Sequence, residues 1–511
     1  MKVVVRSRLM VAAAAIAIAG ALNSAPVVAQ EPVRGGTLTV GFPADAKTFD
    51  PRFSVIFSER QVMYPVYNTL TKLGPDFSIN PELATSWDVL DGGKRIVFKL
   101  RTGVKFHDGT DFNAEVVKWN IDSRLDEETK SPQRKQLVKV VESVDVVDEH
   151  TVAFNLLGPF PALMGMLGQR VGFMVSPAAA QQHGEEFGSN PVGTGPFIFK
   201  EWVRGSHVRL ERNPDYWEDG LPYLDKIHYE DVAGSVVGIQ RLATGELDYV
   251  GQLSPNDIRS IEGNDDVELH PVKVGRWHSL QWRWDRAPFN DANFRLAVAH
   301  AIDRKHIVDI LTAGMATMAA GPTPPGLWWY SELEAFEHDP AKAKEYLSKS
   351  SYKPGTEVPL VVAGTGVYPR IGALVQEQLQ AVGIAIQLQP VPQKGWYGKV
   401  LKGEFEFTPT RWTQRPDPDG LLQILFHTDG FANSTKYSNP KVDALLEQAR
   451  TMTDIPKRKA IYAEAQQQIA ADLPYVSLFF AVEYGATRKR VQDFEWIPDQ
   501  IPRFRELWLS N

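Results

Sequence analysis

Residues 100–117 read LRTGVKFHDGTDFNAEVV and carry three local signals in one short stretch. The β-rich run at residues 95–100 predicts a strand, and the glycines that follow it predict a turn into a short second strand. Asp111 or Asn113 can then cap a helix, because its side-chain oxygen accepts a hydrogen bond from a free N–H group of the first turn. The sequence AEVVKWNIDSRL at residues 114–125 suits that helix. This order of elements predicts the start of a compact α+β unit.

The sequence on either side extends this unit and separates it from two other regions. Two β-rich runs around an Asp-Glu turn at residues 141–156 predict a hairpin, so residues 76–195 form one predicted α+β insert. Residues 196–286 have an α/β pattern of their own, and residues 287–487 are more helical. Within the latter, residues 358–391 read as a strand, an amphipathic helix and a second strand, which predicts a βαβ unit.

The N-terminus has the three parts of a secretory signal peptide. A short basic head is followed by an apolar run over residues 9–21, and small residues precede a predicted cleavage site after Ala29. The run is too short for a comfortable membrane span, although an uncleaved anchor helix is the alternative. The signal peptide predicts a periplasmic protein. Because the chain has no cysteine, we expect it not to be a lipoprotein and to have neither disulfides nor zinc–thiolate sites.

Composition narrows the class of partner. The net charge of −7 becomes more negative once the basic leader is removed, whereas a nucleic-acid-binding protein needs a basic face. No later segment is apolar enough to span a bilayer, so we expect contact with the membrane only through a partner. Motifs of serine hydrolases, zinc proteases, P-loop proteins and dinucleotide-binding enzymes are absent, which disfavours an enzyme. Scattered histidines, and a DPDG stretch without the glutamate of an EF-hand, predict no metal site and no cofactor.

Residues 411–420, RWTQRPDPDG, mix aromatic, cationic and acidic side chains. The aspartates suit a turn that caps the next helix, which leaves Trp412 and Arg415 unexplained. Arg370 begins the helix of the βαβ unit, where a cation is unfavourable unless it faces an anion bound at the strand ends. A solvated surface arginine is the equal alternative. Trp282 shares a strand face with a tryptophan two residues later, and this stripe is either core or the aromatic wall of a ligand site.

Several separate stretches, in this order along the chain, resemble one protein family. They are GGTLTVGFPADAKTFDP, LATSWDVLDGGKRIVFKLRTGVKFHDGTDFNAEVVKW, NPVGTGPFIFKEW, RNPDYW, LATGELDYV, APFNDANFRLAVAHAIDRKHIV, DPAKAKEYL and RWTQRPDPDG. The chain is similar, over nearly its whole mature length, to the periplasmic solute-binding proteins of ABC importers, family 5, which is the peptide, nickel and opine class. The LRTGVKFHDGTDFNAEVV stretch is the most specific of these matches.

The resemblance implies an α/β fold of the periplasmic-binding-protein type (type II, cluster C), with two main lobes around a ligand cleft and an extra α+β lobe. Lobe I would combine residues 30–75, 196–286 and 488–511. Lobe II would be residues 76–195, and lobe III residues 287–487. A hinge would close lobes I and III over a ligand, which then passes to the importer's permease. The implied protein is a monomeric receptor and not an enzyme.

In dipeptide-binding members of this family, the segment that matches RWTQRPDPDG carries an aspartate for the peptide's amino group. Here Gln414 and Arg415 stand in its place, and a cation there disfavours a free amino terminus. Arg370 matches the arginine that binds the peptide carboxylate, Trp412 would line the pocket, and Phe57 lies in a segment that lines the cleft. The resemblance therefore implies a ligand with more than one acidic group, such as a glutathione-like or modified peptide, an opine-like conjugate or another organic acid.

Two other functions are alternatives. A nickel-chelate or haem carrier of the same family could hold its cargo through arginines, and metal analysis of the purified protein would identify it. A secreted hydrolase would need a nucleophile that no motif indicates, and turnover of a bound ligand would be required to support it.

Overall fold

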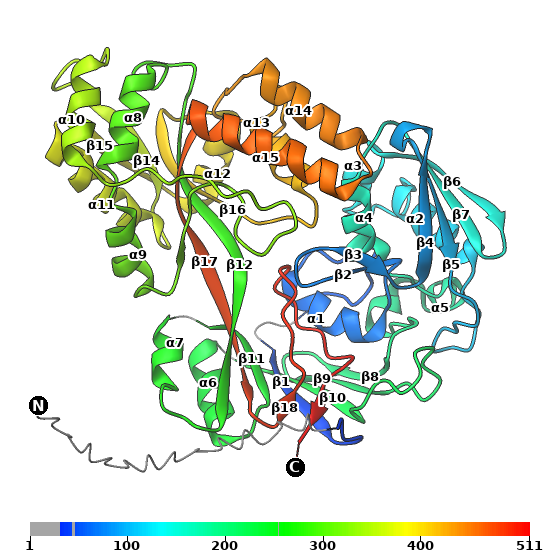
Figure 1. Ribbon diagram of the computed structural model, residues 1–511. Coiled ribbons are helices and arrows are strands. Elements are labelled where there is room, and N and C mark those ends of the chain that lie inside the picture. The colour runs from blue at the N-terminus through cyan, green and yellow to red at the C-terminus, as the bar shows by residue number, and fades with distance from the viewer. Residues whose placement is uncertain (1–30, 43–45, 233, 254, 511) are drawn as a thin grey trace, which may run out of the picture. The chain divides into compact units, whose positions relative to one another are not determined.

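Two long antiparallel strands run through the largest sheet and join its two halves (Figure 1). They are β12 (Val267–Trp282) and β17 (Tyr475–Arg488), and in this computed structural model they are neighbours in an 11-stranded sheet. The structure describes residues 31–42, 46–232, 234–253 and 255–510. The predicted signal peptide lies outside the described residues.

The half of the sheet beyond β17 has parallel strands at its centre. Its strands, in spatial order, are β11 (Tyr249–Leu253), β1 (Thr37–Phe42), β10 (Lys226–Asp231), β9 (His207–Arg212) and β8 (Phe197–Val203). β1 pairs in parallel with β10 and β11, whereas β8 and β9 are antiparallel. Helix α1 (Phe57–Val66) packs on this half through a hydrophobic cluster around Val40, Val62 and Tyr229, which we call the β1 core.

The half beyond β12 contains the predicted βαβ unit. Its strands, in spatial order, are β16 (Phe407–Trp412), β14 (Val358–Ala363) and β15 (Ile386–Val391). Helix α11 (Tyr368–Val382) connects the parallel strands β14 and β15 and ends at Gly383 in the left-handed conformation, which confirms the prediction. The cluster around Leu280, Val375 and Phe407 is called the β14 core. The helices that pack around this half include α8 (Ala292–Ala301), α9 (Arg304–Thr312), α10 (Pro340–Lys349), α12 (Gln393–Lys402), α13 (Leu422–Phe426), α14 (Pro440–Thr451) and α15 (Ile455–Asp472).

The predicted insert has a sheet and a core of its own. Its antiparallel strands, in spatial order, are β4 (Ala84–Leu90), β5 (Arg95–Leu100), β7 (Thr151–Leu156) and β6 (Val141–Asp148). Helix α2 (Ala114–Leu125) begins at the predicted cap, where Asn113 Oδ1 accepts a 3.1 Å hydrogen bond from the N–H of Val116. With α4 (Ala162–Leu167), these elements enclose the β5 core around Phe98, Val117 and Leu163.

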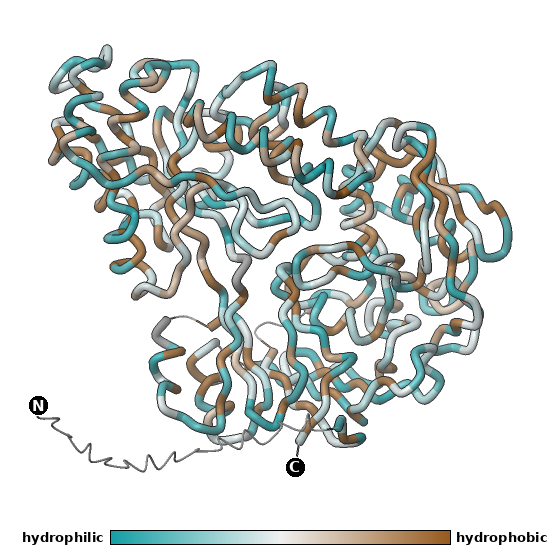
Figure 2. The backbone as a smooth tube through the Cα atoms, in the orientation of Figure 1, coloured by the Kyte–Doolittle hydropathy of each residue, from teal (hydrophilic) through white to brown (hydrophobic). Residues whose placement is uncertain are grey.

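Residues 33–511 form one compact unit, so the boundaries of the three lobes stay a prediction. Figure 2 shows apolar and polar residues alternating along the helices and strands, which gives each element a face to bury. In the described part of the chain, no helix is long and apolar enough to cross a membrane.

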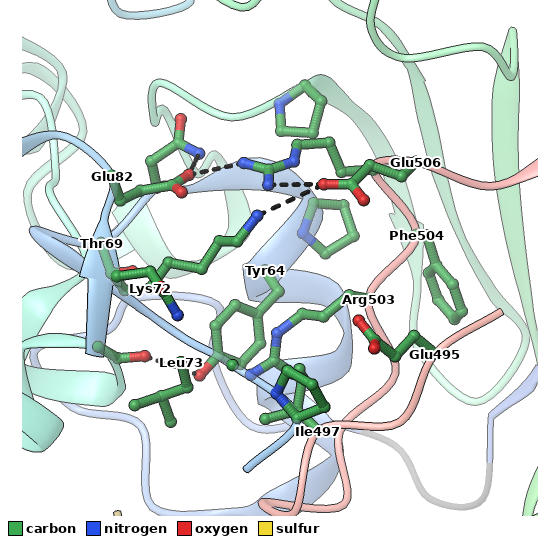
Figure 3. A pocket seen from close by; sticks show the side chains of 18 of the residues that line it. Tyr64, Thr69, Lys72, Leu73, Glu82, Glu495, Ile497, Arg503, Phe504 and Glu506 are labelled. Atoms are coloured by element: carbon green, nitrogen blue, oxygen red, sulfur yellow. Dashed lines mark hydrogen bonds and ion pairs between the residues drawn. The ribbon is translucent and has the colours of Figure 1, made fainter. Parts of the chain in front are cut away.

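A buried ion network ties the C-terminal segment to the hairpin of β2 (Thr71–Leu73) and β3 (Ile79–Pro81) (Figure 3). Arg505 donates to Glu82 over 2.9 Å and lies 3.2 Å from Glu218. It borders a cavity of about 320 Å³ between α1, this hairpin and the C-terminal segment. Arg503 faces the Tyr64 ring of α1 and pairs with Asp499 over 2.7 Å. Arg503 therefore links α1 to the C-terminal segment, because it contacts Tyr64 and Asp499 at the same time.

Arg505→Met should lower the free energy of unfolding by about 3 kcal/mol or more, because Glu82 is only 5 % exposed and would lose its cation. Urea denaturation measures the change. Lys105→Met, which removes the exposed ion pair with Asp111, should cost less than about 1 kcal/mol. Adding Glu82→Gln to Arg505→Met should restore part of the loss, and a double variant as weak as the sum of the two singles would contradict the pairing.

The pairing of β12 with β17 shifts register between Val272 and Arg276, where a bulge bends the strands. Gly275 lies in this bulge. A β-carbon built there would lie 1.3 Å from the backbone oxygen of Ala481 on β17. Only glycine lets the two strands approach this closely at the place where they pass between the halves of the sheet.

Gly275→Ala should therefore lower the free energy of unfolding by about 3 kcal/mol, since its clash is with backbone and no rotamer relieves it. Gly158→Ala is the control, because a β-carbon there meets no atom within 4 Å, and its melting temperature should stay close to that of the unsubstituted protein. Equal stability of the two variants would show that the strands separate readily at the bulge.

Candidate ligand-binding site

Helix α1 carries an acid and a base side by side at its start. The Glu59 carboxylate is fully buried and accepts hydrogen bonds from the N–H groups of Val55 and Ile56, from two further N–H groups and from the hydroxyl of Ser54. Both oxygens are therefore occupied, and the structure records no ion pair between Glu59 and Arg60. Arg60 lies over the ring of Phe57 at 5.4 Å, and its buried Nε has no hydrogen-bond partner in the described residues.

Two contacts bring other parts of the chain to this helix. The hydroxyl of Tyr64, one turn after Arg60, donates to the backbone oxygen of Gly168 over 3.2 Å. Gly168 is followed by the short 3₁₀ helix η2 (Arg170–Gly172). On the neighbouring helix α4, a β-carbon at Gly165 would lie 2.6 Å from Pro416, so the segment after β16 packs closely on α4. These contacts gather elements of the β1, β5 and β14 cores.

Three arginines meet where these elements come together. Burial lowers the pKa of Arg170 to about 10, and the positive charges of Arg60 and Arg415 act in the same direction, whereas the Glu59 carboxylate opposes them. Burial and the charge of Arg60 also lower the pKa of Arg415. Arg415 is exposed to solvent, although neighbouring protein partly desolvates its guanidinium group. We call Arg60, Arg170 and Arg415 the arginine triad.

No acid in the described part of the chain forms an ion pair with the triad, and the nearby Glu59 carboxylate is occupied by N–H groups and a hydroxyl. Among the described residues, none of the three side chains has a hydrogen bond or an ion pair, and the buried Nε atom of Arg170 has no acceptor. Like charges held close together disfavour each other, and a desolvated guanidinium needs acceptors for its N–H groups. An anion bound among the three groups satisfies both requirements, because carboxylates and phosphates accept charge-assisted hydrogen bonds from arginine.

Four of the predicted site residues lie beside the triad or belong to it. Arg415 is a member, and Phe57 lies under Arg60. Trp412 is half-buried, and its indole Nε1 has no acceptor in the described residues. Gln414 is buried and donates to the backbone oxygen of Pro322 over 2.8 Å, while its Oε1 has no donor. The stretch RWTQ therefore presents two unused polar atoms next to the cationic group.

The other two predicted residues are placed elsewhere. Trp282 was expected as a ligand contact but is fully buried in the β14 core, where it stacks on Phe289 at 5.1 Å, because α8 covers this face of β12. The core interpretation of the tryptophan stripe therefore holds for Trp282. Arg370 is exposed at the start of α11 and donates to the backbone oxygen of Ile310.

The DPDG turn after the triad is a structural anchor. Asp417 accepts the N–H of Asp419 and begins a short 3₁₀ helix, as the sequence predicts for a capping turn. Its carboxylate forms a two-pronged ion pair with Arg458 over 2.7 and 2.8 Å, and Asp419 pairs with Arg450. Both carboxylates are therefore committed to arginines of α14 and α15. Across the described residues, no group of three or more His, Cys, Asp or Glu side chains could hold a metal ion.

Arg60 and Arg170 were missed as site residues by the sequence analysis. Arg60 lies at the edge of the segment that contains Phe57, so the resemblance pointed close to it. Arg170 lies in the stretch GQRVG, which has neither periodicity nor a motif, and only the packing of α4 on the segment after β16 brings it to Arg415.

Comparison with known proteins places the chain in a family. Residues 78–433 match the bacterial extracellular solute-binding proteins, family 5 middle. The chain is 30% identical to the glutathione-binding protein GsiB of Pectobacterium atrosepticum over 459 residues, which are 87% of this chain and 88% of that protein. It is similar to the periplasmic binding protein DppA of Helicobacter pylori in complex with the peptide STSA, with a TM-score of 0.74 and 26% identity over 94% of this chain and 99% of that one. It is also similar to AgaA of A. tumefaciens R10 in complex with agropinic acid, with a TM-score of 0.71 and 26% identity over 93% and 99% of the two chains.

These similarities cover most of the chain and agree with its architecture. The mixed α/β fold, with its long shared sheet, is that of the type II periplasmic binding proteins. The relatives are solute-binding proteins and not enzymes. The chain therefore belongs to the bacterial extracellular solute-binding proteins of family 5, the receptors of ABC transporters.

Proposed function

We propose that this protein captures an anionic, peptide-like solute and delivers it to the permease of an ABC importer. The observation that carries the proposal is the arginine triad, whose three guanidinium groups form no ion pair or hydrogen bond with an acid among the described residues. Glutathione and agropinic acid, which relatives bind, are carboxylic acids, and this chemistry fits the triad.

The triad also argues against an ordinary dipeptide with a free amino terminus near Arg415. The ammonium of such a dipeptide has no carboxylate on its own carbon, unlike that of glutathione, so it would meet three positive charges without compensation. The nearest carboxylates are occupied: Glu59 by backbone N–H groups, and Asp417 by Arg458. Repulsion in a desolvated cleft costs several kcal/mol, on the order of what separates a bound from an unbound solute. A carboxylate or another acidic group fits at this position instead.

Capture and delivery follow from the location of the triad. Its members extend from elements of three cores, so a ligand that touches all of them would stabilise the arrangement in which those elements lie together. We place the hinge in β12 and β17, which join the halves of the large sheet (Figure 1). In this proposal the protein is a periplasmic monomer, exported by a signal peptide cleaved after Ala29, and it reaches the membrane only through the permease.

Arg415→Ala, Arg170→Ala and Arg60→Ala should each raise the Kd for glutathione by about 10- to 100-fold, because each removes charge-assisted hydrogen bonds of roughly 1.5–3 kcal/mol. The melting temperature of the unliganded variants should stay constant or rise, since the loss of one charge relieves repulsion among the remaining two. Isothermal titration calorimetry and thermal unfolding measure the two effects.

Lys344→Ala is the control, because it removes one exposed positive charge on α10 and should leave the Kd unchanged. Native mass spectrometry of protein purified gently from the periplasm would identify the resident solute. A neutral or basic solute, together with unchanged affinity in all three arginine variants, would refute the anionic ligand and leave only the receptor class.

A further inference from the structure

A second cavity, of about 260 Å³, lies next to the triad at the free edge of β16. β14 ends at Ala363 and pairs with β16 at Phe407, whereas β16 continues to Trp412 beside β12 alone. The cavity occupies the space beyond the end of β14, below the start of α11 and beside α12. In open α/β sheets, ligands bind at this carboxyl edge of parallel strands.

Aromatic rings form the walls of this cavity. Tyr368 of α11 packs against Trp396 of α12 with ring centroids 4.6 Å apart, and Tyr397 and Trp412 also line the space. Trp396 is fixed by a hydrogen bond from its Nε1 to the hydroxyl of Thr408 over 3.2 Å. Rigid aromatic walls of this kind pack against the apolar part of a ligand while a nearby polar group of the same ligand is hydrogen-bonded.

Two buried polar atoms on these walls have no partner. Tyr368 is only 3 % exposed, yet its hydroxyl has neither donor nor acceptor within the described residues. The indole Nε1 of Trp412 is buried and unpaired as well. A buried donor without an acceptor is costly, and native structures place such groups where a ligand or water completes the bond.

One cation of the cavity is unopposed. Arg411 lines it and has no hydrogen bond or ion pair with any described residue, whereas the nearby Arg276 pairs with Glu483 over 3.0 Å. His278 lies opposite Arg411 across the strand pair and is neutral, because burial first, and then Arg411 and Arg276, lower its pKa to about 3. Arg411 therefore supplies the only uncompensated charge among the described side chains that line the cavity.

We propose that this cavity is a second acid-binding subsite, in which Arg411, the Tyr368 hydroxyl and the Trp412 indole N–H hold a carboxylate of the same ligand that the triad binds. The subsite rests on the proposed function, since it assumes an acidic solute in the cleft. Its Arg411 takes the carboxylate role that the family resemblance assigns to Arg370, whose guanidinium instead bonds the backbone oxygen of Ile310 outside this cavity.

The two subsites are close enough for one small molecule. Tyr397 lines the cavity with Arg411 and also opposes the lowering of the pKa of Arg415, so it lies near both cationic groups. Arg411 and Arg415 are four residues apart, which separates their α-carbons by at most about 14 Å. The ligand class is therefore a short peptide or conjugate, of the order of two or three residues long, with an acidic group at each end.

The test compares glutathione with its ethyl ester at the glycine carboxylate, which lacks one acidic group. Calorimetry on the full-length mature protein should show glutathione binding at least 10-fold more tightly than the ester. Arg411→Ala should weaken glutathione binding by at least 10-fold and leave the affinity for the ester within about twofold. Tyr368→Phe should also weaken glutathione binding, with a smaller effect. Arg411→Lys, which keeps the charge, should have an affinity for glutathione between those of the unsubstituted protein and Arg411→Ala.

Arg370→Ala is the matched control, as an exposed arginine of the same region, and should change neither affinity. Equal losses for glutathione and its ester in Arg411→Ala, or no loss in either, would overturn the second subsite while Arg415→Ala still weakens binding and upholds the proposed function. A protein that binds neither compound, with an unchanged melting temperature in both, would overturn the anionic ligand and the subsite together. Thermal unfolding of each unliganded variant confirms that the fold is intact.

Discussion

The pairing of β12 with β17 is the constraint on which the rest of the molecule depends. These strands are the only members of the large sheet that connect the β1 side to the β14 side in the described residues. The sheet is therefore continuous only through their pairing. Their bulge at Gly275 combines close backbone approach with a local bend. A receptor that must open and close around a solute needs this combination, because the link has to bend without letting its strands separate.

The cleft departs from the pairing rule that governs the rest of the protein. Elsewhere, buried arginines have hydrogen-bond acceptors: Arg458, Arg503 and Arg505 pair with carboxylates, whereas Arg124 and Arg295 donate to backbone oxygens. The arginine triad and Arg411 have none within the described residues, and the acid nearest the triad is occupied by backbone N–H groups. Cationic groups that lie together without any hydrogen-bond acceptor indicate a binding function more than a structural one.

Local signals predicted most of the framework, because they depend on residues close together in sequence. Asn113 caps its helix and Gly383 ends another through contacts within a few residues. The site was predicted only in part, because it depends on contacts between distant segments. Spacing alone could not tell whether Trp282 faces core or cleft, since this depends on whether α8 covers that face of β12. Arg170 became a candidate only when folding brought it to Arg415, which lies 245 positions later in the chain.

The unopposed arginines have a consequence for the empty receptor in its surroundings. Positive groups that face solvent without a carboxylate attract chloride, phosphate and other small inorganic anions, which screen them. Uptake of a solute is then an exchange, in which the arriving acid displaces loosely held ions and gains entropy from their release. The exchange grows less favourable as the salt outside the cell becomes more concentrated. The receptor's apparent affinity for its solute therefore depends partly on the salinity of the habitat, and occupancy is highest in dilute surroundings.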